Sequence, residues 1–223
     1  MNIPAYWTFK SEEVARGFDR HVREQLPWYD LATGIVTHVA RHYIPEGGLV
    51  YDVGASTGNI GRALEEVIEK RSAQFVAIDS AREMADTYSG PGAFVTADAT
   101  TYAFERFDFA VVFLALMFFP VDCRRSWVES MAAKTKPGGA LLVFDKCAPG
   151  QGYVSTVMSR LALSGKRSAG VPADEIIEKE LSLAGVQRPI DAEKIMPDSA
   201  VEVFRFGDFA GWIIEGPTEE QKP

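Results

Sequence analysis

The stretch Val50-Tyr51-Asp52-Val53-Gly54-Ala55-Ser56-Thr57-Gly58-Asn59 decides the fold that this sequence predicts. It joins a short apolar run to two glycines four positions apart, and a helix-like stretch starts at Asn59. Glycine allows the backbone to turn sharply and to approach a ligand closely. A strand, a glycine-rich turn and a helix in this order are typical of the first βα unit of a ligand-binding parallel sheet.

The same alternation of apolar runs and helix-like stretches continues on both sides of this turn. Continuous Val, Ile, Leu and Phe runs predict strands that are covered on both faces of a parallel sheet. Near the end of the chain, two apolar runs separated by Gly207-Asp208 predict a β-hairpin. We therefore predict a doubly wound α/β fold with a seven-stranded, mostly parallel sheet and a C-terminal antiparallel hairpin strand. The predicted strands are 49–53, 74–78, 93–96, 107–116, 140–144, 201–206 and 209–214; the predicted helices are 11–26, 28–43, 59–71, 81–88, 124–134, 154–164 and 173–184.

Residues 1–223 have the length of a single domain. Ligands of such sheets bind at the carboxyl ends of the strands, where the strand order reverses. Residues 1–45 are expected to form an N-terminal helical lid over that edge, with Ser11 as the N-cap of its first helix, and residues 147–190 a helical insert. Together they would enclose the pocket for a second substrate.

Composition and charge exclude several classes of protein. The net charge is −8, from 23 Lys and Arg against 31 Asp and Glu, which argues against non-specific nucleic-acid binding. The longest apolar run, 109–120, falls short of the roughly 20 residues of a membrane span, and no signal peptide is visible. Cys123 and Cys147 are expected to be free thiols, and no metal motif is present. We expect a cytoplasmic protein without a membrane or metal partner.

Acidic residues stand at the ends of three successive predicted strands, namely Asp52, Asp79 and Asp98. The carboxylate of Asp52 would repel a pyrophosphate but would bind an ammonium group. Asp79 suits two ribose hydroxyls, and Asp98 suits an exocyclic amine such as that of adenine. Each residue viewed alone could equally cap a helix or a turn. The set indicates an adenosine ligand with an ammonium group and no phosphate, a description that S-adenosyl-L-methionine (SAM) fits.

At this point residues 48–146, including Lys136-Pro137-Gly138-Gly139, resemble the Rossmann-like class I SAM-dependent methyltransferases. Nearly the whole chain resembles the carboxy-S-adenosylmethionine synthase family, which serves the modification of a wobble uridine in tRNA. The matching pieces include Trp7-Thr8-Phe9, Pro27-x-Tyr29, Ala77-Ile78-Asp79, Lys166-Arg167-x-x-Gly170 and Phe204-x-Phe206-Gly207. The resemblance implies a homodimer. Resemblance and strand ends together give the expected cofactor residues Tyr29, Asp52, Gly54, Ala55, Ser56, Gly58, Asp79, Ser80, Asp98, Ala99 and Phe113.

Two departures from the family pattern concern the cofactor. Phe113 stands where the family has Asn, and Glu180, with Lys179 beside it, stands where the family holds the extra carboxylate of its cofactor with Arg. Because two carboxylates repel each other, we expect ordinary SAM rather than carboxy-SAM. A carboxy-SAM synthase, or a transferase that uses carboxy-SAM in tRNA modification, stays the alternative.

The second substrate is expected to be a small molecule or a modified nucleoside. Its candidate contacts are His21, Met117, Lys166, Arg167 and Glu180, each of which could instead be a core or surface residue. No catalytic base or nucleophile stands out, so the catalytic residues are not assigned. A non-catalytic SAM-binding subunit and an NAD-binding protein are the alternatives of other classes.

Overall fold

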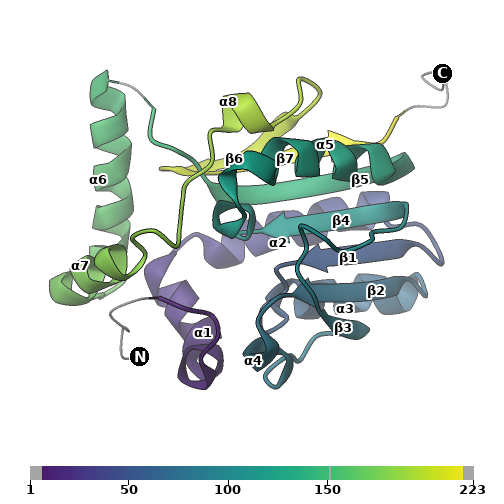
Figure 1. Ribbon diagram of the computed structural model, residues 1–223, viewed down its shortest axis with the longest axis horizontal. Helices are drawn as coiled ribbons and strands as arrows, with labels where there is room; N and C mark the ends of the chain where they lie inside the picture. The colour runs from purple at the N-terminus through teal and green to yellow at the C-terminus, as the bar shows by residue number, and fades with distance from the viewer. Residues whose placement is uncertain (1–6, 151, 218–223) are drawn as a thin grey trace.

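The computed structural model describes residues 7–150 and 152–217, and a seven-stranded sheet runs through its centre (Figure 1). The strand order is β3-β2-β1-β4-β5-β7-β6, so the order reverses beside β1. β1 to β5 are parallel, whereas β7 runs antiparallel to both β5 and β6. This confirms the predicted α/β fold with its C-terminal hairpin. The strands are β1 (Leu49–Val53), β2 (Gln74–Asp79), β3 (Ala93–Thr96), β4 (Phe107–Phe113), β5 (Thr135–Lys146), β6 (Val201–Phe206) and β7 (Phe209–Glu215).

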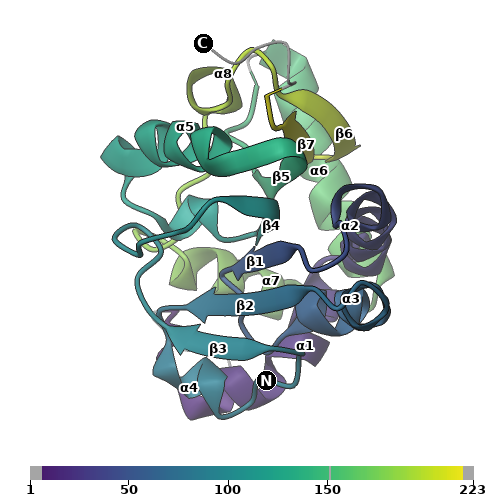
Figure 2. The same cartoon turned by 90° about the vertical axis from the view of Figure 1, so that its right-hand side faces the viewer.

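Alternate residues of the central strands serve two separate cores, because successive side chains of a strand point to opposite faces. Val50 and Phe109 pack on the face covered by α2 (Tyr29–Tyr43) and α3 (Asn59–Lys70). Tyr51 and Ala110 pack on the other face, against Trp127 of α5 (Arg124–Lys134). Figure 2 shows α2 and α3 on one side of the sheet and α5 on the other.

Three further helices lie near the carboxyl ends of the strands, namely α1 (Glu12–Gln25), α6 (Gly152–Ser168) and α7 (Ala173–Ser182), as Figure 1 shows. The hydroxyl of Ser11 accepts the backbone N–H of Val14 at 3.4 Å, so the predicted N-cap of α1 is confirmed. The remaining short helical segments are α4 (Arg82–Ala85), η1 (Leu116–Phe118), η2 (Val121–Cys123) and α8 (Ala192–Ile195).

Four predicted elements have clearly different bounds, one of them the helix predicted over 154–164, which spans Gly152–Ser168. The strand predicted over 107–116 ends at Phe113, because Leu114 takes a positive φ of 59° and the chain turns into η1. The helix predicted over 81–88 keeps only Arg82–Ala85, and the hydroxyl of Tyr88 instead donates to the carbonyl of Pro91 at 2.7 Å. The strand predicted over 140–144 extends to Thr135–Lys146, because Thr135 pairs with β4 and β7 pairs with the strand up to Lys146. Within 7–150 and 152–217, no helix combines the length and the apolar character needed to cross a membrane.

Candidate functional site

A cavity of about 330 Å³ lies at the carboxyl ends of β1, β2 and β4. Its size falls within the range typical of small-molecule sites. Residues from the turn after β1, from the ends of β2 and β3, from α1, from the segment after β4 and from α6 and α7 line it. The cavity therefore lies where the strand order predicts a ligand.

The turn after β1 takes its shape from two residues with positive φ. Gly54 has a φ of 78°, and a Cβ added there would lie 2.5 Å from the Cβ of Ala115. Only glycine fits this position without displacing the segment after β4. Ser56 has a φ of 50°, and its backbone N–H donates to Oδ2 of Asp79 at 2.9 Å. The carboxylate at the end of β2 thus fixes the turn that follows β1.

Asp79 braces two backbone turns and lines the cavity at the same time. Its Oδ1 accepts the backbone N–H of Ala81 at 2.9 Å, but Ala81 is itself the N-cap of α4, which has no side-chain cap, so the alternative of a helix-capping Asp79 is wrong. Burial raises the pKa of Asp79, although the N–H groups of Ala81, Ser56 and Ser80 partly offset this. Each carboxylate oxygen has a second lone pair, so both can still accept a ligand hydroxyl.

Asp52 is a buried carboxylate in the wall of the cavity. Its side chain is 1% exposed, and neither carboxylate oxygen has a hydrogen-bond partner among the described residues. Burial, followed by the nearby charge of Asp79, raises the pKa of Asp52 to about 8. A buried polar group without a partner is costly and rare in folded proteins. Asp52 therefore has the chemistry of a site for a cationic or donor group of a ligand.

The other expected cofactor contacts lie around these two carboxylates. Asp98 lines the cavity, and its Oδ1 accepts the backbone N–H and the hydroxyl of Thr100 at 2.8 and 2.7 Å. The rings of Tyr29 and Phe113 meet edge to face, with centroids 5.4 Å apart. Burial raises the pKa of Tyr29, so its hydroxyl stays protonated and available as a donor at neutral pH.

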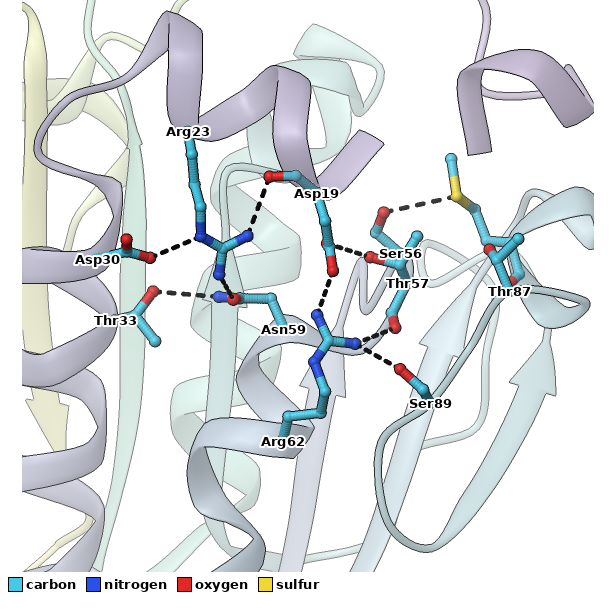
Figure 3. A network of polar contacts seen from close by, with 11 residues as sticks. Asp19, Arg23, Asp30, Thr33, Ser56, Thr57, Asn59, Arg62, Thr87 and Ser89 are labelled. Atoms are coloured by element: carbon cyan, nitrogen blue, oxygen red, sulfur yellow. Dashed lines mark hydrogen bonds and ion pairs between the residues drawn. The ribbon is translucent and has the colours of Figure 1, made fainter. Parts of the chain in front are cut away.

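A clasp of five residues, Asp19, Arg23, Thr57, Asn59 and Arg62, fastens α1 to the turn after β1 (Figure 3). The carboxylate of Asp19 accepts the hydroxyl of Thr57 and the guanidinium of Arg62. The guanidinium of Arg23 donates to Oδ1 of Asn59 at 2.7 Å. These contacts hold α1 beside the glycine turn. The sequence analysis missed them, because the partners lie more than thirty positions apart.

The part of the cavity under α1 has aromatic walls. Trp7, Phe9, Phe18 and Phe118 line it, and the ring of Phe9 meets the rings of Phe18 and Phe118 edge to face at 5.9 and 4.9 Å. His21 also lines this part, 3% exposed, with its ring stacked on Trp7 at 5.6 Å. This region can bind an apolar group.

A lysine cluster, which we define as Lys146, Lys166 and Lys179, surrounds Glu180 at the edge of the same region. Oε1 of Glu180 accepts Nζ of Lys166 at 2.9 Å, and Oε2 lies 3.8 Å from Nζ of Lys146. Burial alone would raise the pKa of Glu180, but the charges of Lys166 and Lys146 outweigh it and lower the pKa. The amino group of Lys179 lies over the ring of Trp7, and burial lowers the pKa of Lys179 to about 6. Lysines thus compensate the charge of Glu180, which the sequence argument for its repulsion of an anionic ligand did not include.

Most of the predicted site residues share this one cavity, but two do not. Gly58 begins α3 with a φ of 92°, and a Cβ there would meet Tyr88 and the backbone of Gly90 rather than the cavity. Arg167 donates to the carbonyl of Val171 at 2.8 Å, beside the end of α6. The predicted residues that line the cavity are His21, Tyr29, Asp52, Gly54, Ala55, Ser56, Asp79, Ser80, Asp98, Ala99, Phe113, Met117, Lys166 and Glu180.

Several lining residues were missed, among them Gln25 and Lys146. Gln25 is four positions after His21, so helical periodicity could have placed both on one face. Lys146 ends β5, so the rule that ligands bind at the carboxyl ends of the strands could have identified it, as it identified the three acids. In the described part of the chain, no cluster of His, Cys, Asp or Glu is suited to a metal ion.

Comparisons with known proteins agree with this geometry. Residues 50–139 match the model of a methyltransferase domain family. Carboxy-S-adenosyl-L-methionine synthase of Staphylococcus epidermidis is 27% identical over 192 residues, covering 84% of each chain. The enzyme of the same name from Wolinella succinogenes is 27% identical over 219 residues, covering 92% of this chain and 91% of that one.

Solved structures share the fold at low sequence identity. A protein of Methanococcus maripaludis described as an S-adenosyl-L-methionine-dependent methyltransferase superposes with a TM-score of 0.57 at 16% identity, covering 100% of both chains. Human N-acetylserotonin methyltransferase in complex with SAM gives a TM-score of 0.57 at 14% identity, covering 94% of this chain and 58% of that one. Residues 50–139 thus match a methyltransferase domain, and the chain has the fold of SAM-dependent methyltransferases.

Proposed function

We propose that the protein is a SAM-dependent methyltransferase that acts on a small molecule or a nucleoside. The observation that carries this proposal is the buried, unpartnered carboxylate of Asp52 in a cavity that Asp79 and Asp98 also line. When bound, SAM supplies a methyl group activated by its sulfonium. Asp52 would hold the ammonium group, Asp79 the ribose hydroxyls and Asp98 the adenine amine, while Tyr29 and Phe113 close the wall beside them.

This protein would contribute mainly positioning, because a sulfonium is already a good leaving group. The α1 clasp keeps one wall of the cavity close to the glycine turn. The aromatic walls around Phe9 exclude water and would orient an apolar acceptor beside the cofactor.

The test compares three ligands and one transfer reaction. Isothermal titration calorimetry should show binding of SAM and S-adenosylhomocysteine (SAH) but no binding of NAD. Incubation with methyl-labelled SAM and a small-molecule or RNA extract should give a labelled product. Binding without any product would favour a non-catalytic SAM-binding subunit, and binding of NAD alone would overturn the proposal.

A second candidate function is carboxy-SAM synthesis or carboxy-SAM-dependent transfer in tRNA modification. The lysine cluster favours it, because the ammonium groups of Lys146 and Lys166 around the one carboxylate of Glu180 leave an excess of positive charge for a carboxylate ligand. Relatives of that name match most of the chain. Lys166→Met should then weaken the binding of carboxy-SAM but not of SAM. Lys194→Met, on the exposed side of α8, is the matched control.

A further inference from the structure

His21 is a buried polar group for which the structure gives no partner. Its side chain is 3% exposed and lines the cavity, and neither ring nitrogen has a hydrogen-bond partner among the described residues. Stacking on Trp7 fixes the plane of the ring. A buried imidazole without a partner is costly, so it indicates a position that a ligand completes.

The surroundings of His21 define which nitrogen can act on a ligand. Nδ1 lies 3.9 Å from Oε1 of Glu175 on α7, and the same oxygen accepts Nε2 of Gln25 at 3.1 Å. A ring nitrogen that faces a carboxylate carries the proton in the neutral imidazole. Nε2, on the opposite side of the ring, is then a bare hydrogen-bond acceptor.

A second acceptor lies on the same face of α1. Oε1 of Gln25 is buried and unpartnered, while its amide nitrogen is committed to Glu175. Two acceptors, Nε2 of His21 and Oε1 of Gln25, can recognise only a group that donates a hydrogen bond. The aromatic walls formed by Phe9, Phe18 and Phe118 surround the same part of the cavity.

Burial, with help from nearby charges, keeps the imidazole of His21 neutral. Burial lowers its pKa to about 4, and the ammonium groups of Lys179 on α7 and Lys166 on α6 act in the same direction. Glu175 is the acidic group that faces Nδ1, and Lys166 and Lys146 balance Glu180. At neutral pH one ring nitrogen of His21 is therefore unprotonated and carries a free lone pair.

From this geometry we propose, resting on the proposed methyltransferase function, that His21 is the catalytic base and that the methyl acceptor is an apolar, ring-bearing molecule with a hydroxyl or N–H group. Nε2 of His21 takes the proton of the O–H or N–H group. The lone pair left on that oxygen or nitrogen forms the bond to the methyl carbon. The bond from this carbon to sulfur breaks, its electron pair stays on sulfur as a thioether, and His21 later returns its proton to solvent.

The test reads the ring nitrogens of His21 directly. The chain has three histidines, so a long-range ¹H–¹⁵N spectrum of the full-length protein contains three imidazoles. His38→Asn and His42→Asn, both exposed residues of α2, assign the other two signals without touching the cavity. Between pH 8 and pH 5.5 we expect His21 to stay neutral, with the proton on Nδ1.

Two probes then test what Nε2 recognises. In the SAH complex, phenol should shift the Nε2 signal of His21, whereas anisole, which lacks the O–H group, should not. A proton on Nε2, a charged ring at neutral pH, or an Nε2 signal that phenol leaves unmoved would overturn the role of His21. Failure of SAH to bind in calorimetry would instead contradict the methyltransferase function itself, so the two failures are distinguishable.

Discussion

The carboxylate of Asp79 at the end of β2 accepts the backbone N–H of Ser56, in the turn after β1, at 2.9 Å. One side chain thereby ties two strand ends together and leaves lone pairs that face the cavity. The turn is held in its ligand-binding shape by a group that we also assign to the ligand.

Asp79→Ala should therefore affect folding and binding together. Loss of the acceptor leaves the N–H groups of Ser56 and Ala81 unpaired, which should cost about 1–3 kcal/mol of stability. Affinity for SAH should fall by about 10-fold, as expected for lost charge-assisted hydrogen bonds. Calorimetry and urea denaturation measure the two effects. An affinity that stays within twofold of the wild type would show that the ribose assignment is wrong.

Asp52 should make the stability of the ligand-free protein depend on pH. Its pKa is about 8 in the fold against an ordinary value of 3.8, so between these values the folded state holds a proton that the unfolded chain has lost. The free energy of unfolding should thus fall as pH rises through this window, by up to about 1.4 kcal/mol per pH unit for one proton.

Asp52→Asn should remove this contribution. Urea denaturation at pH 5, 6 and 7 should give a shallower decrease than in the wild type, while the similar contribution of buried Asp145, whose pKa burial raises to about 7, remains in both proteins. Parallel pH profiles of wild type and variant would mean that the carboxyl of Asp52 is not protonated in the fold.

Gly54 and Gly138 form a matched pair that separates backbone strain from steric contact. Both have positive φ, 78° and 76°, but an added Cβ meets Ala115 at Gly54 and nothing within 4 Å at Gly138. Each substitution by Ala should cost about 1–2 kcal/mol for the left-handed backbone. Gly54→Ala should cost about 1–3 kcal/mol more for the clash and should weaken SAH binding. Equal losses in thermal unfolding would rule out close packing at Gly54.

The α1 clasp predicts that a distant carboxylate controls the lifetime of the complex. Asp19→Ala removes the acceptor for Thr57 and Arg62, so α1 should exchange its amide hydrogens faster and SAH should dissociate more quickly. Asp30→Ala is the control: its carboxylate is 71% exposed and pairs with Arg23 at 2.9 Å, so it should change stability by less than about 1 kcal/mol. If both variants release SAH at the same rate, the clasp does not hold α1 over the bound ligand.

The shared location of the three strand-end acids was predictable, because it depends only on the order of strands and helices along the chain. Parallel strands bring their carboxyl ends to one edge, so Asp52, Asp79 and Asp98 converge whatever the details of packing. The compensation of Glu180 was not predictable. It depends on how α6 and α7 pack beside β5, which brings Lys146 and Lys166 to the same carboxylate from 34 and 14 positions away. The ends of β4 and α4 were also predicted wrongly. The positive φ of Leu114 ends β4 inside an apolar run, and the contact of Tyr88 with Pro91 follows α4 inside a helix-like stretch.

The most direct test of the central claim measures what Asp52 recognises. SAH carries the amino-acid ammonium group, whereas 5′-methylthioadenosine lacks the amino-acid part and keeps the adenosine. Asp52→Asn should weaken SAH by about 10-fold or more, since a charge-assisted hydrogen bond is lost, and should leave methylthioadenosine unchanged. Asp86→Asn, an exposed residue after α4, is the control. A loss of equal size for both ligands, or for neither, would contradict the assignment of Asp52 to the ammonium group.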